Sequence, residues 1–314
     1  MSNLKNSKIL LTGGHGFLGE KVYAELLKAG ANPKNISRPR SADLDLRMAA
    51  NAAKAVKSKD LVIHLAANVG GIGYNQKHPG QLFYDNAIMG INLIEAARKD
   101  DVKKFVQVGT VCAYPKFTPV PFKEKDLWAG YPEETNAPYG LAKKILLTQL
   151  QAYRQEYGFN GIYLLPVNLY GPGDNFNPAS SHVIPALIKK FVDAVKHNRK
   201  QVVVWGTGKA SREFLYVDDA ARAIVLAAQK YDGPEPVNIG SNFEITIKDL
   251  VKLIGKLTGF KGEIVWDKTK PDGQPRRKLD VSRAKKQFGF ISKVSFPLGL
   301  KTTVDWYRKQ ITKK

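Results

Sequence analysis

The residues best suited to chemistry in this chain are a hydroxyl, a thiol, a phenol and an amine. Thr110 and Cys112 come first, and Tyr139 and Lys143 follow them as a Tyr-x3-Lys pair. On a helix this spacing places the phenol and the ammonium one turn apart on the same face. The arrangement suits a phenol that gives or takes a proton near neutral pH. Together the four groups indicate proton transfers at carbon combined with hydride transfer.

The elements that must position these groups alternate between strands and helices. Cys112, the only cysteine, follows directly after an apolar strand, where open α/β sheets build their sites. The alternation predicts an α/β fold, a Rossmann-type doubly wound parallel sheet with a smaller C-terminal substrate-binding lobe. The strands predicted in the first half are 8–12, 61–65, 104–108 and 161–165, with a short second strand ending near 36–37. The helices predicted there are 17–29, 81–99 and 139–157.

The second half has a looser pattern and suggests a gradual domain boundary. We expect residues 1–170 to form the nucleotide-binding Rossmann domain, with later segments around 200–240 returning to it. Residues 171–314 then form mainly the substrate-binding lobe. The elements predicted in this half are helices at 182–197, 218–229 and 247–258, a strand at 201–205 and a turn-rich loop at 270–275.

A glycine-rich turn joins the first strand to the first helix. Its sequence is Gly13-Gly-His-Gly16-Phe-Leu-Gly19. Glycines at this place allow a tight turn and let backbone amides approach a pyrophosphate at the positive end of the helix. The motif therefore predicts dinucleotide binding. The predicted contacts are Gly13, Gly14, His15, Gly16, Phe17, Leu18 and Gly19.

The residues after the second strand indicate which dinucleotide is bound. An NAD site would place an acidic residue there to accept from the ribose 2′-hydroxyl. The chain instead has Arg38-Pro-Arg40. Guanidinium groups suit a 2′-phosphate through charge-assisted hydrogen bonds, so we predict NADP(H), with contacts from Arg38 and Arg40. The alternative is that both are solvated loop arginines.

The net charge of +21 raises the question of a nucleic-acid partner. The basic residues are spread along the whole chain, and clusters such as Arg276-Arg277-Lys278 are short. A solvated basic surface is therefore the favoured interpretation, and no nucleic acid is predicted. No apolar run approaches the roughly 18 residues of a membrane span. The lack of a signal peptide and of a cysteine pair favours a cytoplasmic protein without a membrane partner.

Longer motifs extend these patterns and carry a resemblance. Taken with the glycine turn and the Tyr-x3-Lys pair, they resemble the extended short-chain dehydrogenase/reductases and, within them, the GDP-L-fucose synthase family. The resemblance runs from about residue 8 to about residue 310. The motifs are Val69-Gly-Gly-Ile72, Cys112-Ala-Tyr-Pro-Lys116, Asn168-Leu-Tyr-Gly-Pro-Gly-Asp-Asn-Phe176, Ser181-His-Val-Ile-Pro-Ala186, Val204-Trp-Gly-Thr-Gly208, Arg212-Glu-Phe-Leu215 and Lys270-Pro-Asp-Gly273.

The resemblance implies roles for individual residues. Tyr139 and Lys143 match the general acid and its helper, while Cys112 and His182 match the epimerisation acid/base pair. Thr110 stands where the family commonly has serine, Val111 replaces a second serine, and His15 replaces an arginine of some members. Cofactor contacts are implied for Val108, Lys143, Pro166, Asn168 and Leu169. Contacts to a GDP-sugar are implied for Lys190, Trp205, Arg212 and Asp272.

The function that the resemblance implies is conversion of a GDP-4-keto-6-deoxyhexose by epimerisation at C3 and C5 followed by NADPH-dependent reduction at C4. A GDP-sugar is the expected substrate, no metal is expected, and a homodimer paired through helices 81–99 and 139–157 is expected. Three alternatives remain open. They are a GDP-hexose epimerase that recycles bound NAD, a reductase of a related keto-sugar nucleotide such as the colitose precursor, and a nucleotide-binding protein without turnover.

Overall fold

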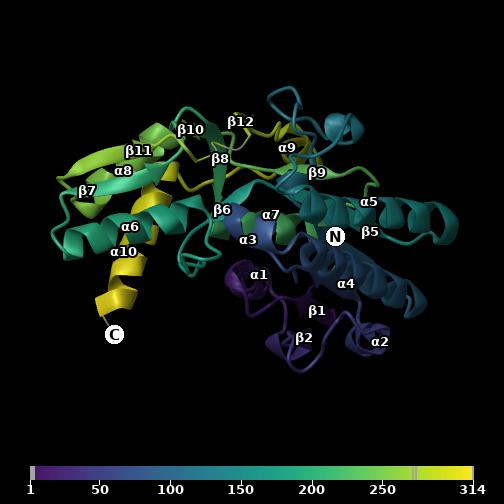
Figure 1. The fold of residues 1–314 in the computed structure, drawn as a ribbon. Coiled ribbons are helices and arrows are strands. Elements are labelled where there is room, and N and C mark those ends of the chain that lie inside the picture. Colours follow the sequence, from purple (N-terminus) through teal and green to yellow (C-terminus); the bar gives the residue numbers. More distant parts are fainter. Residues whose placement is uncertain (1–3, 271, 273, 313–314) are drawn as a thin grey trace.

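A six-stranded parallel sheet forms the centre of the larger lobe in the computed structural model, which describes residues 4–270, 272 and 274–312 (Figure 1). The strand order is β2-β1-β3-β4-β5-β9, the order of a doubly wound sheet, so the predicted fold class is confirmed. Its strands are β1 (Ile9–Thr12), β2 (Ile36–Ser37), β3 (Leu61–His64), β4 (Lys104–Val108), β5 (Gly161–Pro166) and β9 (Val237–Ile239).

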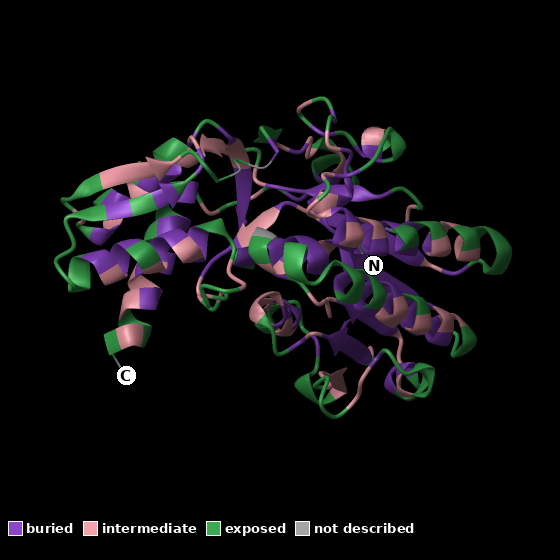
Figure 2. Cartoon of the chain, in the orientation of Figure 1, coloured by how far each residue is buried: buried purple, intermediate pink, exposed green. Residues whose placement is uncertain are grey.

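Two layers of helices enclose this sheet. One layer consists of α2 (Ala49–Val56), α4 (Pro79–Lys99) and α5 (Ala137–Tyr157) packed side by side, and the other pairs α1 (Phe17–Lys28) with α7 (Val217–Lys230). Every residue of β1, β3 and β4 is buried. Strands covered on both faces have no solvent side, which is why they read as continuous apolar runs rather than alternating ones. Figure 2 shows the buried strands inside and the exposed helix faces outside.

The smaller lobe has its own core and short sheets. Its helices pack their apolar faces together around buried residues such as Phe191, Leu250 and Val304. One sheet contains β6, β8, β10 and β12, and the other pairs β7 with β11. The elements are β6 (Asn168–Tyr170), α6 (Val183–Lys196), β7 (Gln201–Trp205), β8 (Ser211–Tyr216), β10 (Glu244–Thr246), α8 (Ile247–Thr258), β11 (Glu263–Asp267), β12 (Arg276–Arg277) and α10 (Phe296–Thr312).

Short connecting elements complete the chain. They are η1 (Pro33–Asn35), α3 (Ile72–Lys77), η2 (Val111–Ala113), η3 (Glu124–Trp128) and α9 (Ser282–Phe288).

The segment 200–240 divides between the two lobes. Strand β9 pairs with β5 in the central sheet, and α7 packs on α1. Strand β7 does not return, because it pairs with β11 in the smaller lobe. The reason is visible in the burial pattern of β7, which alternates exposed and buried residues. A strand with one solvated face suits a sheet covered on one side only.

Candidate active site

A cavity of about 1650 Å³ lies where the carboxyl ends of β1, β3, β4 and β5 meet the smaller lobe. Open α/β sheets bind ligands at this edge. The cavity brings together all five residues predicted to be catalytic. They are Thr110, Cys112, Tyr139, Lys143 and His182.

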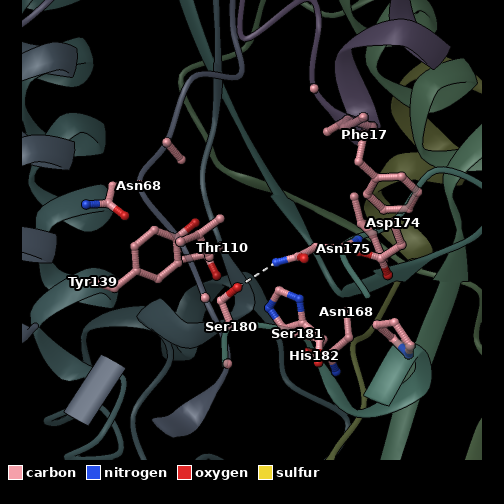
Figure 3. A pocket seen from close by; sticks show the side chains of 18 of the residues that line it. Phe17, Asn68, Thr110, Tyr139, Asn168, Asp174, Asn175, Ser180, Ser181 and His182 are labelled. Carbon is pink, nitrogen blue, oxygen red and sulfur yellow. Dashed lines mark hydrogen bonds between the residues drawn. The ribbon is translucent and has the colours of Figure 1, made fainter. Parts of the chain in front are cut away.

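Cys112 and Tyr139 are brought together by the packing of α5 on the short turn η2. Thr110 begins that turn, and its Oγ1 accepts a hydrogen bond of 3.2 Å from the backbone N–H of Cys112. Gly140 of α5 packs so closely on this turn that a side chain there would collide with the carbonyl oxygen of Cys112. The neighbouring Tyr139 therefore sits directly beside the thiol and the hydroxyl. Thr110 and Tyr139 lie on the same side of the cavity (Figure 3).

Burial controls the protonation of the Tyr139–Lys143 pair. Tyr139 is 8% exposed and Lys143 is 2% exposed. Burial raises the pKa of Tyr139, and a charge on Cys112 raises it further, while a hydrogen bond with Thr110 acts in the opposite direction. Burial lowers the pKa of Lys143 to about 8. Lys143 thus keeps most of its positive charge at neutral pH, which is the charge that favours an ionising phenol.

His182 lines the cavity from the smaller lobe, at the start of α6. The loop before it is held by a 3.0 Å hydrogen bond from the N–H of Gly71 to the carbonyl of Ser180, and by one of 2.9 Å from Asn175 to the Ser180 hydroxyl (Figure 3). His182 is exposed to solvent where it lines the cavity, although many protein atoms lie around its imidazole. This desolvation lowers the pKa of its imidazole. At neutral pH the ring is therefore mostly uncharged.

The glycine turn forms a cradle at the other end of the cavity. Gly13 has a φ of +66°, and a side chain there would lie 2.8 Å from the backbone nitrogen of Ala66. A side chain at Gly19 would collide with the carbonyl of Gly13. No side chain in the described part of the protein caps the start of helix α1, so its first amides can meet an anion, and the residues present fit a dinucleotide pyrophosphate. Gly13, His15, Gly16, Phe17, Leu18 and Gly19 line the cavity.

The two arginines predicted to bind the 2′-phosphate occupy different environments. Arg40 is exposed and lines the cavity. Arg38 packs beneath the turn, where it donates to Glu20 and to the carbonyl of Gly14, both at 3.1 Å. Its guanidinium also lies 3.8 Å from the centre of the Tyr23 ring. Arg38 and Gly14 therefore support the turn, and Arg40 is the arginine placed to meet a ligand.

The remaining predicted residues also line the cavity. Val108, Pro166, Asn168 and Leu169 line it at or just beyond the ends of β4 and β5, and Lys190, Trp205, Arg212 and Asp272 line it from the smaller lobe. Trp205 is 59% exposed, with the ammonium groups of Lys190 and Lys270 at 5.7 and 5.8 Å from its ring centre. A flat, exposed ring flanked by cations suits an electron-rich aromatic base.

Arg212 and Asp272 are joined through the backbone. Arg212 donates to the carbonyl of Asp272 at 3.2 Å. The carboxylate of Asp272 accepts from the amide and the hydroxyl of Thr207 at 2.7 and 2.6 Å, so it fixes a turn at the mouth of the cavity. Pro271 and Gly273 of the same motif lie outside the described residues.

Asp174 and Arg277 are two of the cavity residues that were not assigned a role from the sequence. Asp174 has one carboxyl oxygen bonded to the N–H of Asn175 at 2.7 Å and the other buried without a partner among the described residues. Burial raises the pKa of Asp174 to about 7. Arg277 lies against Cys112. Asp174 lies within the motif from Asn168 to Phe176, so the sequence did offer a signal for it. Arg277 lies in the basic cluster Arg276-Arg277-Lys278, which was interpreted as solvated surface.

Two further features bear on the predicted ligands. Within residues 4–270, 272 and 274–312, no cluster of histidine, cysteine, aspartate and glutamate has the arrangement needed to hold a metal ion. In the same residues, no helix combines the length and apolar character needed to cross a membrane.

Comparison with known proteins places these features in a family. The model of the NAD dependent epimerase/dehydratase family matches residues 9–240. The chain is 41% identical to GDP-L-fucose synthase 1 of Arabidopsis thaliana, over 98% of this chain and 95% of that protein. It is 37% identical to the GDP-L-fucose synthase of Escherichia coli K12, over 97% of each.

Structural comparison agrees. The crystal structure of a GDP-L-fucose synthetase from Naegleria fowleri bound to NADP superimposes with a TM-score of 0.90 at 28% identity, covering 99% of this chain and 96% of that one. The chain belongs to the NAD dependent epimerase/dehydratase family, in the branch that contains the GDP-L-fucose synthases.

Proposed function

We propose that the chain converts GDP-4-keto-6-deoxy-D-mannose to GDP-L-fucose, by epimerisation at C3 and C5 followed by NADPH-dependent reduction at C4. One observation carries the proposal: the Tyr139–Lys143 pair and the Cys112–His182 pair line one cavity. Reduction alone needs only the first pair. A thiol and an imidazole that line the same cavity are what epimerisation adds.

Epimerisation requires a base on one face of the sugar and an acid on the other. The 4-keto group acidifies the protons on C3 and C5, and a thiol and an imidazole both exchange protons near neutral pH. Cys112 is proposed as the base and His182 as the acid. The lowered pKa of His182 makes its protonated ring a stronger acid. The enolate oxygen formed between the two transfers needs donors, and Thr110 and Tyr139 are placed to supply them.

Reduction uses the same cavity and the same donors. Bound NADPH supplies the hydride for C4. Tyr139 gives its proton to the C4 oxygen as the alkoxide forms, and the Thr110 hydroxyl holds that oxygen in place. Lys143, one turn away on α5 and mostly protonated at neutral pH, is proposed to favour the phenolate form of Tyr139 through its positive charge. Gly13, Gly16, Gly19 and Arg40 are the residues proposed to hold the diphosphate and the 2′-phosphate.

The direct test is an assay of the purified protein with GDP-4-keto-6-deoxy-D-mannose, with NADPH and NADH side by side. We expect consumption of one NADPH per GDP-L-fucose formed. No loss of NADPH absorbance would refute the reductase part of the proposal. Epimerisation of a GDP-hexose that lacks the keto group, without added cofactor, would instead identify an epimerase that recycles bound NAD. Turnover only with a 3-deoxy keto-sugar nucleotide would identify a colitose-type reductase.

A homodimer in the cytoplasm is also proposed. Helices α4 and α5 pack side by side and expose large apolar residues, which favours burial against a second copy. These residues are Phe83, Tyr84, Ile91, Ile145 and Tyr157. The single cysteine fits a reducing compartment.

A further inference from the structure

Arg277 touches the thiol of Cys112 from across the chain. Its Nη1 donates toward Sγ at 3.7 Å, between residues 165 positions apart. We propose that Arg277 is a positioning residue that pairs with the thiolate of Cys112 and so sets the pH range in which this residue can act as a base. The base role itself rests on the proposed function.

The guanidinium of Arg277 is held in place by a neutral partner. Its Nε and Nη2 both donate to Oε1 of Gln274, at 3.1 and 2.9 Å. Gln274 in turn donates from Nε2 to the carbonyl of Lys116 at 2.9 Å, in the loop that follows Cys112. These hydrogen bonds orient the guanidinium so that the remaining Nη1 of Arg277 points at the sulfur of Cys112. Since Gln274 carries no charge, it orients the guanidinium without neutralising it.

The surroundings of Arg277 are short of negative charge. The residue is 8% exposed, and β12 places it in register with Arg212 of β8. Burial, followed by the charge of Arg277, lowers the pKa of Arg212 to about 10. Arginine stays protonated when buried, so two cations persist side by side. An anion at Sγ relieves this imbalance, and a nearby cation is what favours a thiolate over a thiol.

Other charged groups act on the same site from neighbouring elements. Tyr139 faces the thiol from α5 and is neutral near pH 7, because burial raises its pKa. Arg212 adds a second positive charge from β8. Two acidic residues act on Arg212, and both have other partners. Asp272 accepts hydrogen bonds from Thr207, and Glu133 accepts them from Thr135 and Asn136.

A competing role for Arg277 is binding of the substrate diphosphate. The two roles differ in the absence of substrate. A thiolate partner changes the reactivity of Cys112 in the empty enzyme, whereas a diphosphate ligand changes only the KM for the sugar nucleotide.

The test uses Cys112 as its own reporter, because it is the only cysteine in the chain. The rate of alkylation by iodoacetamide is measured between about pH 5 and pH 10 for the wild type, Arg277→Gln, Arg277→Lys and Arg276→Gln. Arg276 is the matched control, since it is the adjacent arginine but is exposed and bonded to Glu244 at 2.7 Å. No sugar nucleotide is used, so the result is independent of the proposed reaction.

We expect Arg277→Gln to slow alkylation at neutral pH about tenfold and to move the half-maximal rate to higher pH, since a charge-assisted bond is worth roughly 1.4 kcal/mol or more. The alkylation rate of Arg277→Lys should lie between those of Arg277→Gln and the wild type, and the rate of Arg276→Gln should match the wild type. An unchanged profile for Arg277→Gln overturns the proposal. A raised KM with an unchanged profile assigns Arg277 to the diphosphate instead.

A comparison within the wild type covers the case in which Arg277→Gln does not fold. The same alkylation profile is measured for the folded protein and for the protein unfolded in urea, where Arg277 no longer lies beside the thiol. The half-maximal rate must come at lower pH in the folded protein. Equal midpoints overturn the proposal.

Discussion

The hydroxyl of Thr110 and the backbone N–H of Cys112 are joined by a hydrogen bond of 3.2 Å. Because the hydroxyl accepts from this amide, its own proton is free to point toward Tyr139 or toward a carbonyl in the cavity. One turn of 3-10 helix therefore carries both the proposed epimerisation base and the proposed carbonyl donor. Their separation is fixed by backbone geometry rather than by flexible side chains.

Thr110→Val should lower the rate of reduction about 10²-fold or more, because it removes a donor to the developing oxyanion while keeping the shape of the side chain. The measurement is NADPH consumption at saturating substrate. Thr110→Ser keeps the hydroxyl and should retain most of the wild-type rate. Near-normal turnover by Thr110→Val would mean that the hydroxyl only caps the turn.

Cys112→Ser and Tyr139→Phe should separate the two halves of the reaction. Cys112→Ser should nearly abolish exchange of the C3 and C5 protons with deuterated water while NADPH still binds. Tyr139→Phe should mainly stop reduction and leave part of the exchange. Proton exchange is measured by NMR and reduction by the loss of NADPH absorbance, on the same samples. Wild-type exchange in Cys112→Ser would show that the thiol is structural.

Arg40→Ala should raise the KM for NADPH about tenfold or more and leave the KM for NADH unchanged, since only NADPH carries the 2′-phosphate. Arg38→Ala serves as the comparison. It removes the bond to Glu20 and the contact with Tyr23, so it should lower the Tm and affect both cofactors alike. A selective loss of NADPH binding in Arg38→Ala, but not in Arg40→Ala, would contradict this division.

Asp174→Asn should stabilise the protein more at about pH 8 than at about pH 5. Burial raises the pKa of Asp174 from 3.8 to about 7, so the folded state holds a proton that the unfolded state has released. The stability linked to that proton is therefore present at low pH and is lost as the pH rises through 7. Between about pH 5 and pH 8 the stabilising effect of the substitution should grow by at most about 2.7 kcal/mol, because the folded-state pKa of about 7 lies about two units above pH 5.

The measurement for Asp174→Asn is urea unfolding at both pH values. Asn keeps the acceptor for the N–H of Asn175, so packing is preserved. Asp305→Asn, which removes an exposed carboxylate bonded to Lys301, should not reproduce this pH trend. A gain that is equal at both pH values would show that Asp174 is ionised in the folded protein.

Ile91→Arg combined with Ile145→Arg should shift the protein from dimer to monomer in light scattering, because each places a charge on the apolar face of α4 or α5. Leu298→Arg, at an exposed position of α10, should leave the mass unchanged. A monomeric wild type, or a dimer that survives the double substitution, would refute the proposed pairing.

The sequence by itself determined the order of the elements and the chemistry that one helix or one turn can hold. Strands β4 and β7 and helix α8 begin and end where the apolar runs predict. The spacing of Tyr139 and Lys143 and the glycines of the first turn are local features, so their geometry follows from neighbouring residues alone.

Only the tertiary structure decided which distant side chains meet and which way they face. It separated Arg40 from Arg38, although the two stand two positions apart, because one points into the cavity and the other beneath the turn. It also placed Arg277 on Cys112. Contacts of this kind depend on how sheets and loops pack in space, and the order of charged residues along the chain does not specify that packing.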